Sequence, residues 1–354
     1  IELKDKKIGF ITSGASYLYL KETLPDASIL KLGAIHPLPI GLIKKISTYV
    51  DKLYVIEDGQ SVIEKEIRSM GINIAKDVDL KKFPDFTFFT PEIIKSKFLV
   101  NDIVAQPLQD IPFRLPMNCA GCSHLFVYYI LKKYHLKATT DVTCGGLGIF
   151  PHINAFTNAK HMGSSIGIAH GFNCANDDKE NYIAVIGDGG FWATGINGLI
   201  NLTFNKGNTK VIIVDNQCIA MTGGQDVPSS RPEYSSSLDI KETCHALGIQ
   251  DVIEVDPYKI DDFEKDVISS LNRDGNGVII VKKECLVKFK PEVKGQCTID
   301  NEACLKCKAC LQISCPALEI LKDNGEEKIH IDSGLCVGCK LCQTNCKNGA
   351  INYE

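Results

Sequence analysis

The stretch Ile183-Ala184-Val185-Ile186-Gly187-Asp188-Gly189-Gly190 decides the fold of the larger part of this chain. Its apolar residues predict a buried strand, and the glycines predict a turn into the helical stretch 191–205. A second apolar strand, 211–214, then runs into Asp215 and Asn216. Glycines let the backbone approach a phosphate group, and a helix N-terminus favours negative charge. This order predicts a parallel α/β sheet with an anion site where its strands end.

On either side of this stretch, further apolar segments predict the remaining strands of the sheet and a second α/β unit. Strands are expected at 138–142, 252–255 and 278–281, separated by helix-length segments. Nearer the N-terminus, strands and helices are expected to alternate at 8–12, 16–23, 29–32, 42–49, 53–57 and 61–70. Prolines at 107, 112 and 116 predict a linker. We expect an α/β domain over 1–100, a linker over 101–116, a second α/β domain over 117–290 and a small domain over 291–354.

Composition narrows the classes of partner. The 354 residues carry a formal net charge of -4, with a pI near 6.1, so there is no basic surplus for binding nucleic acid. No stretch reaches the roughly 18 consecutive apolar residues of a membrane span. Residues 1–7 do not resemble a signal peptide. The expectation is a cytoplasmic protein with neither nucleic acid nor membrane as its partner.

Sixteen cysteines, eight of them between Cys304 and Cys346, predict metal binding in a reducing compartment. They form the runs C-x2-C-x2-C-x4-C-P and C-x2-C-x2-C-x3-C, which are typical of two-cluster bacterial ferredoxins except for one extra residue in the first run and Lys347 in place of a proline. Structural zinc is the alternative, although it usually takes paired C-x2-C arms. The predicted [4Fe-4S] ligand sets are Cys304, Cys307, Cys310 and Cys346 for one cluster, and Cys336, Cys339, Cys342 and Cys315 for the other.

The motif at residues 187–189 is followed after about 26 residues by Asn216, a spacing that resembles the thiamine-diphosphate motif. Mg²⁺ prefers oxygen ligands and often binds through one or two protein groups plus phosphates, which suits the carboxylate of Asp188 and the amide of Asn216. The resemblance implies the backbone carbonyl of Cys218 as a third magnesium ligand, and residues 220–225 resemble a cofactor loop of the same family. The alternative is an ordinary Rossmann-like domain.

Both motifs together resemble the α subunits of indolepyruvate ferredoxin oxidoreductases, within the 2-oxoacid:ferredoxin oxidoreductase superfamily. Residues 12–17, 24–28 and 30–33 resemble its transketolase-C-terminal-like domain, and residues 118–124, 141–144 and 162–167 resemble its thiamine-binding domain. Asn118-Cys119-Ala120 departs from the more usual CPGC pattern. The resemblance implies that the cofactor is bound by Gly187, Asp188, Gly189, Asn216, Cys218, Thr222, Gly223, Met162, Gly163 and Ser164.

Four more cysteines, Cys119, Cys122, Cys144 and Cys285, resemble the ligands of a third [4Fe-4S] cluster beside the thiamine in pyruvate:ferredoxin relatives. Buried thiols without metal are the alternative, because free cysteine is commonly buried. His124 follows the Cys119–Cys122 loop and is the candidate catalytic residue, a donor near the substrate, because imidazole switches protonation near neutral pH. Its alternative role is that of an ordinary histidine at a helix start.

The resemblance implies oxidative decarboxylation of an arylpyruvate with coenzyme A to acyl-CoA, CO₂ and reduced ferredoxin. The expected cofactors are thiamine diphosphate, Mg²⁺ and the clusters, and the expected partners are a smaller β subunit and external ferredoxin. Alternatives are the same chemistry on pyruvate, a branched-chain 2-oxoacid or phenylglyoxylate, a non-oxidative thiamine decarboxylase, and a non-catalytic electron-transfer fragment. The family's pyrimidine-binding domain does not precede Ile1, so another chain or segment is expected to supply it.

Overall fold

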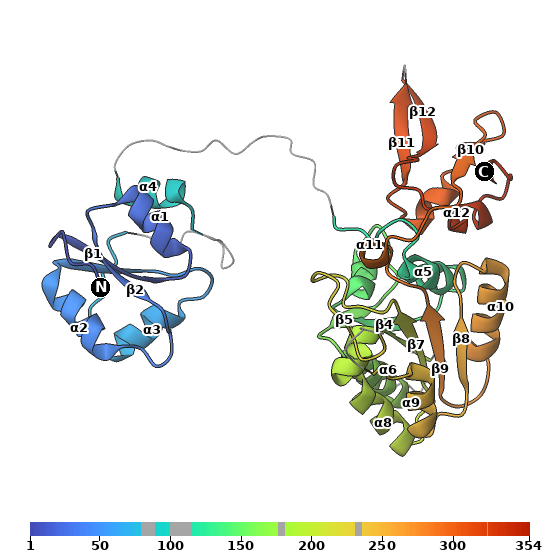
Figure 1. The fold of residues 1–354 in the computed structure, drawn as a ribbon, viewed down its shortest axis with the longest axis horizontal. Coiled ribbons are helices and arrows are strands. Elements are labelled where there is room, and N and C mark those ends of the chain that lie inside the picture. Colours follow the sequence, from blue (N-terminus) through green and yellow to red (C-terminus); the bar gives the residue numbers. More distant parts are fainter. Residues whose placement is uncertain (79–88, 100–114, 176–180, 231–235, 324) are drawn as a thin grey trace. The chain divides into compact units, whose positions relative to one another are not determined.

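The computed structural model describes residues 1–78, 89–99, 115–175, 181–230, 236–323 and 325–354 (Figure 1). The chain forms two compact units, Ile1–Pro112 and Phe113–Glu354. The linker predicted over 101–116 lies outside the described residues, apart from its last two positions. Each unit has a parallel sheet and a core of its own.

The N-terminal unit is built on a three-stranded parallel sheet in the order β2-β1-β3. Phe10 of β1 pairs with Ile29 of β2 and with Tyr54 of β3, and all three side chains are buried on one face. Ile11 and Leu30 belong to the core on the opposite face, as the alternation of side chains along a strand requires. The unit contains β1 (Ile8–Ser13), α1 (Ser16–Thr23), β2 (Ser28–Leu32), α2 (Ile40–Tyr49), β3 (Lys52–Ile56), α3 (Val62–Ser69) and α4 (Pro91–Phe98). The six elements predicted here are confirmed to within two residues, whereas α4 was not predicted.

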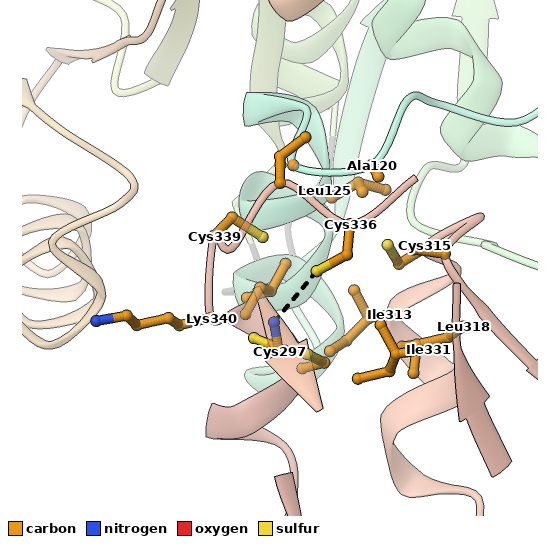
Figure 2. A pocket seen from close by; sticks show the side chains of 15 residues that line it. Ala120, Leu125, Cys297, Ile313, Cys315, Leu318, Ile331, Cys336, Cys339 and Lys340 are labelled. Carbon is orange, nitrogen blue, oxygen red and sulfur yellow. Dashed lines mark hydrogen bonds between the residues drawn. The ribbon is translucent and has the colours of Figure 1, made fainter. Parts of the chain in front are cut away.

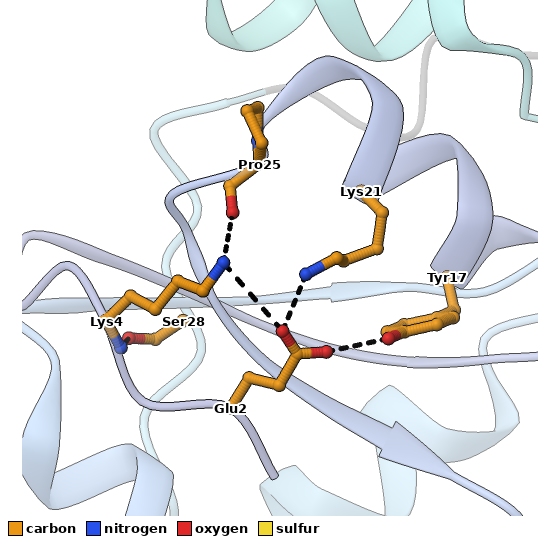
Figure 3. A network of polar contacts seen from close by, with 6 residues as sticks. All are labelled: Glu2, Lys4, Tyr17, Lys21, Pro25 and Ser28. Carbon is orange, nitrogen blue, oxygen red and sulfur yellow. Dashed lines mark hydrogen bonds and ion pairs between the residues drawn. The ribbon is translucent and has the colours of Figure 1, made fainter.

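A polar cluster ties the start of the chain to α1 (Figure 3). The Glu2 carboxylate accepts hydrogen bonds from Lys21 Nζ at 2.6 Å and from Tyr17 Oη at 2.7 Å. The hydrogen bond from Lys21 is the main cause that lowers the pKa of Glu2. Because these side chains are partly exposed, the cluster positions the N-terminal segment and adds little to stability.

The C-terminal unit contains a six-stranded parallel sheet in the order β5-β4-β6-β7-β9-β8. Alternate residues of β6 and β7 enter two different cores: Val185 and Ile212 pack on one face, and Ile186 and Ile213 on the other. The predicted doubly wound sheet is therefore confirmed. Its strands are β4 (Ala138–Asp141), β5 (Asn158–Lys160), β6 (Ile183–Gly187), β7 (Lys210–Asp215), β8 (Val252–Val255) and β9 (Gly277–Lys282), and its longer helices are α5 (Ser123–Lys133), α6 (Ser164–Ala175), α8 (Ile196–Phe204), α9 (Ile240–Ala246) and α10 (Ile260–Leu271).

The helical stretch predicted after the glycines begins earlier than expected and is not uniform. It starts with a short α turn, α7 (Asp188–Gly190), continues as a π segment, η2 (Phe191–Gly195), and becomes regular in α8. A Cβ atom at Gly195 would lie 2.5 Å from Ile186 Cδ1, so this segment packs closely on the strand before it. Widened turns of this kind are frequent at functional sites, and this one directly follows the turn that begins at Asp188.

The cysteine-rich tail consists of short elements that pack on the same unit. β10 (Cys297–Ile299) pairs antiparallel with β13 (Ile351–Tyr353), and β11 (Leu318–Asp323) pairs with β12 (Glu326–Ile331). Two short helices, η3 (Ala309–Ile313) and α12 (Leu341–Thr344), lie in the two cysteine runs. Lys132 Nζ donates to Gln312 O at 2.8 Å, and Ser314 Oγ donates to His152 O at 2.9 Å. The tail is thereby fixed to the domain that carries the large sheet.

Candidate functional site

A small cavity of about 70 Å³ lies where β4, β6 and β7 end. In parallel sheets, ligands bind at the carboxyl ends of strands near the point where the strand order reverses, and here the chain leaves β4 in one direction and β6 in the other. Of the residues predicted from sequence, the cavity gathers His124, Cys144, Met162, Gly187, Asp188, Gly189, Asn216, Cys218 and Thr222. Gly163, Ser164 and Gly223 do not line it.

Asp188 is the charged group at the centre of this cavity. Its side chain is buried, and its Oδ1 accepts the N–H of Gly189 at 2.8 Å. Its Oδ2 is buried and has no hydrogen-bond partner among the described residues. Burial raises the pKa of Asp188 well above its usual range, and the neighbouring Asp215 carboxylate raises this pKa further. A divalent cation would supply the missing partner and neutralise this charge, so Asp188 fits the magnesium role.

The turn after β7 brings Asn216 and Cys218 to the same cavity. Asn216 Oδ1 accepts the backbone N–H of Cys218 at 3.2 Å, and Gln217 between them is left-handed, with a φ of 61°. The backbone oxygen of Asn216 accepts the N–H of Cys285 at 3.0 Å. These contacts fix the amide and the peptide groups of this turn beside Asp188, as a shared metal site requires.

Asp141 at the end of β4 was not predicted as a site residue, yet it holds the loop around Met162. Its Oδ1 accepts the N–H of Ser165 at 2.8 Å, and its Oδ2 accepts the N–H of Gly163. Gly163 has a φ of 83°, and a Cβ atom there would lie 1.8 Å from Thr194 Oγ1. Only glycine fits this position, so Gly163 shapes the loop that brings Met162 to the cavity, and the cofactor-binding role of Gly163 and Ser164 stays a prediction.

His124 is buried at the start of α5, with its Nδ1 at 3.4 Å from Cys122 Sγ. Its Nε2 is buried and has no hydrogen-bond partner among the described residues. Burial lowers the pKa of His124 from 6.5 to about 4. At neutral pH the imidazole is therefore uncharged, and the role of His124 as a donor near the substrate stays a prediction. It can still form one hydrogen bond to a ligand in the cavity.

The four cysteines of the predicted third cluster, Cys119, Cys122, Cys144 and Cys285, lie near one another beside this cavity. Burial raises the pKa of Cys144 to about 11, and the neighbouring thiols of Cys285 and Cys119 also raise it. Burial likewise raises the pKa of Cys122 to about 12. Asn118 Nδ2 donates to Cys144 O at 3.0 Å and lies 4.0 Å from Cys122 Sγ. Because Cys144 also lines the cavity, this group borders the place where the cofactor is expected.

Cys218 also belongs to this neighbourhood through its thiol, which the sequence did not indicate. Burial raises the pKa of the Cys218 thiol to about 12, and the neighbouring Cys285 thiol, which hydrogen-bonds with it, raises it further. The side chain of Cys218 therefore faces the predicted third cluster, in addition to the predicted role of its backbone in metal binding.

The tail cysteines separate into the two groups expected from their spacing. Burial raises the pKa of Cys310, as do the thiols of Cys346, Cys304 and Cys307, its three predicted co-ligands. Around the second group lies a cavity of about 20 Å³ lined by Cys315, Cys336, Cys339 and Cys342 (Figure 2). Within the described residues, no three histidine, cysteine or acidic side chains are placed to hold a single metal ion.

Gly121 connects the two cysteine regions. Together with Ala120 it lines the cavity around the second group of tail cysteines, called the second tail cavity below. Both residues belong to the loop between Cys119 and Cys122. Its φ is 72°, and a Cβ atom on it would lie 2.3 Å from Val337 Cγ2 and 2.7 Å from Tyr258 Oη. Tyr258 Oη donates to Gly121 O at 2.9 Å. Burial raises the pKa of Cys315, and backbone hydrogen bonds, one of them from Gly121, lower it. The loop thus touches a predicted ligand of the tail.

No helix in the described part of the chain is both long and apolar enough to cross a membrane.

Comparison with known proteins identifies both regions. Residues 150–281 match the thiamine pyrophosphate enzyme, C-terminal TPP binding domain, and residues 329–352 match the 4Fe-4S binding domain. The first match contains Asp188 and Asn216, and the second contains Cys336, Cys339, Cys342 and Cys346. A domain for thiamine pyrophosphate and a domain for an iron–sulfur cluster are therefore present in one chain.

Relatives match the chain along its whole length. The indolepyruvate oxidoreductase subunit IorA of Methanothermobacter marburgensis is 30% identical over 100% of this chain and 61% of that protein. The protein of the same name from Pyrococcus horikoshii is 27% identical over 98% of this chain and 60% of that protein. A solved 2-oxoglutarate:ferredoxin oxidoreductase from Magnetococcus marinus gives a TM-score of 0.43 at 18% identity, over 50% of this chain and 66% of that one.

The chain spans about three fifths of the length of these curated relatives. Along its whole length the chain is similar to proteins named indolepyruvate oxidoreductase subunit IorA, and it contains a thiamine-pyrophosphate-binding domain and a 4Fe-4S domain.

Proposed function

We propose that this chain is the cofactor-binding and electron-transferring part of a thiamine-diphosphate-dependent 2-oxoacid:ferredoxin oxidoreductase. The observation that carries the proposal is the cavity at Asp188. A buried carboxylate with an unpartnered oxygen stands there at a strand end, and a group of cysteines borders the same cavity. This combination suits an enzyme that takes electrons from a bound substrate into clusters.

In this proposal each polar group at the cavity has a binding role. Asp188, Asn216 and the backbone carbonyl of Cys218 would hold Mg²⁺, which would neutralise the charge of the diphosphate. When bound, thiamine diphosphate supplies the electron sink for decarboxylation of the 2-oxoacid. His124 donates or accepts one hydrogen bond as a neutral imidazole, because its pKa is lowered to about 4. It positions the substrate rather than transferring a proton at neutral pH.

The cysteines form the electron path. We assign one cluster to Cys119, Cys122, Cys144 and Cys285, and two to the tail. The Gly121 loop lines the cavity of the second tail group, so a cluster held by Cys315, Cys336, Cys339 and Cys342 would stand next to the first group. A cluster held by the remaining group, Cys304, Cys307, Cys310 and Cys346, would supply the electrons for an external ferredoxin.

The substrate assignment is an arylpyruvate, with coenzyme A as the acyl acceptor, because the relatives are named indolepyruvate oxidoreductase subunits. The pyrimidine-binding half of the cofactor site comes from a further segment or chain, and a smaller β subunit completes the enzyme. Reduction of ferredoxin by the assembled complex should be faster with indolepyruvate than with pyruvate at equal concentration. A preference for pyruvate would overturn the substrate assignment and leave the cofactor assignment standing.

The cofactor assignment is tested at Asp188. Replacing Asp188→Asn keeps the side-chain volume and removes the charge that attracts Mg²⁺, so we expect thiamine diphosphate to bind about tenfold more weakly or worse. Isothermal titration with and without EDTA measures this. Asp266→Asn on α10 is the matched control and should bind as the parent does. Equal affinity of the Asp188→Asn variant and the parent would overturn the assignment.

A further inference from the structure

Five cysteines, one more than a cubane requires, line the second tail cavity. Four are the predicted ligands Cys315, Cys336, Cys339 and Cys342, and the fifth is Cys297, which is only 3% exposed. The spacing of the two cysteine runs did not include Cys297, because it precedes the first run and lies in a strand. Only the folded tail brings it to the cavity.

The backbone fixes Cys297 against the loop of Cys336 (Figure 2). The N–H of Cys297 donates to Cys336 Sγ at 3.4 Å, and Gln296 Nε2 donates to Cys336 O at 3.1 Å. On the other side, Cys297 pairs with Tyr353 in the β10–β13 ladder. These contacts hold residue 297 in place without any contribution from its thiol.

The thiol of Cys297 is directed at a second predicted ligand. It hydrogen-bonds with the thiols of Cys342 and Cys336, which line the same cavity, and the backbone of Lys340 also hydrogen-bonds to it. In the first tail group, by contrast, the thiols that interact with Cys310 are those of its three predicted co-ligands.

We propose that Cys297 is a reserve ligand of the second tail cluster that can replace Cys342 on its iron. The inference rests on the proposed cluster function of the tail. In the exchange, the Cys297 thiol releases a proton and forms an Fe–S bond, while the Cys342 sulfur leaves the iron and takes up a proton. The number of thiolate ligands stays constant and no electron is gained or lost.

The test uses the full chain, reconstituted anaerobically with iron and sulfide. Cys342→Ser should retain the parent's iron content, because Cys297 takes the open position. The double variant Cys297→Ser with Cys342→Ser should lose about four iron atoms per chain, one cubane. Cys310→Ser is the matched control in the first tail group and should also lose about four. Loss of a cluster from Cys342→Ser alone, equal to the loss in the double variant, would overturn the inference.

A second measurement does not depend on the stability of the Cys342 variant. Cys297→Ala in the otherwise unchanged chain removes a thiol that hydrogen-bonds to a cluster ligand, so the reduction potential of one tail cluster should fall while the other keeps its value. An EPR-monitored redox titration with unchanged potentials would also contradict the inference. A parent chain that takes up no iron in the tail would overturn the proposed function as well. This result therefore distinguishes failure of the proposed function from failure of the reserve-ligand inference alone.

Discussion

At the scale of single residues, the site depends on buried carboxylates that end neighbouring strands. Asp188, Asp215 and Asp141 follow or end β6, β7 and β4, and all three are buried. Burial raises the pKa of each, and proximity to Asp215 adds to the effect at Asp188. Of these three, only Asp188 has a buried oxygen without a hydrogen-bond partner among the described residues, so it fits the role of a metal ligand best.

The role of Asp141 in holding the loop around Met162 can be tested by substitution. In Asp141→Asn the side chain keeps one acceptor, so one of the N–H groups of Gly163 and Ser165 faces an NH₂ group and loses its hydrogen bond. Leaving a buried donor unsatisfied costs about 1–3 kcal/mol. We expect the free energy of unfolding in urea to fall by that amount and thiamine diphosphate affinity to fall with it. If this variant unfolds like Asp266→Asn, the carboxylate does not hold the loop.

Sequence reasoning found Asp188 and Asn216 because a strand, a glycine turn and a fixed spacing are local patterns. It missed Asp141 and Asp215 as site residues because an aspartate at a strand end looks the same whether it is buried or exposed. The lowered pKa of His124 was missed for a similar reason, because it results from burial by residues that are distant in the sequence. His124, Cys144 and Asp188 meet only in the folded chain.

At the scale of elements, strands with apolar sequences were predicted well, whereas some strands with polar sequences were missed. β6, β7 and β9 were expected from their apolar runs, which suit a sheet covered on both faces, and β4 and β8 were expected although they contain polar residues. β5, with the sequence Asn158-Ala159-Lys160, lies at the edge of the sheet and carries no such signal. β10 and β13 of the tail were missed because three-residue elements show no periodicity.

The loop from Cys119 to Cys122 is the element that joins the two cysteine regions. In Gly121→Ala a methyl group would collide with Val337 and Tyr258 and would also require a left-handed conformation. Overpacking typically costs about 1–3 kcal/mol, so we expect lower stability and a displaced Val337 loop, with loss of iron from the second tail cluster. The variant is checked by urea unfolding and iron analysis.

Gly349→Ala is the matched control for this loop. Its φ is 66°, and a Cβ atom there would meet nothing within 4 Å, so it has the backbone cost without the collision. Equal effects of the two substitutions would show that the backbone conformation of Gly121, and not its contact with the tail, accounts for the loss of stability and of iron.

At the scale of the whole molecule, the C-terminal unit places three groups of cysteines in series from the Asp188 cavity outward. Cys144 lines that cavity, the Gly121 loop lines the second tail cavity, and the first tail group belongs to the same small core as the second. This arrangement puts the thiamine-pyrophosphate-binding domain and the 4Fe-4S domain in one compact unit.

The most direct test of this account is the content of iron and acid-labile sulfide per chain after anaerobic reconstitution. The account predicts about twelve of each, corresponding to three cubanes. About eight of each, unchanged in the Cys285→Ser variant, would contradict it, because the cysteines beside the Asp188 cavity would then hold no cluster. The proposed electron path would then lack its first cluster.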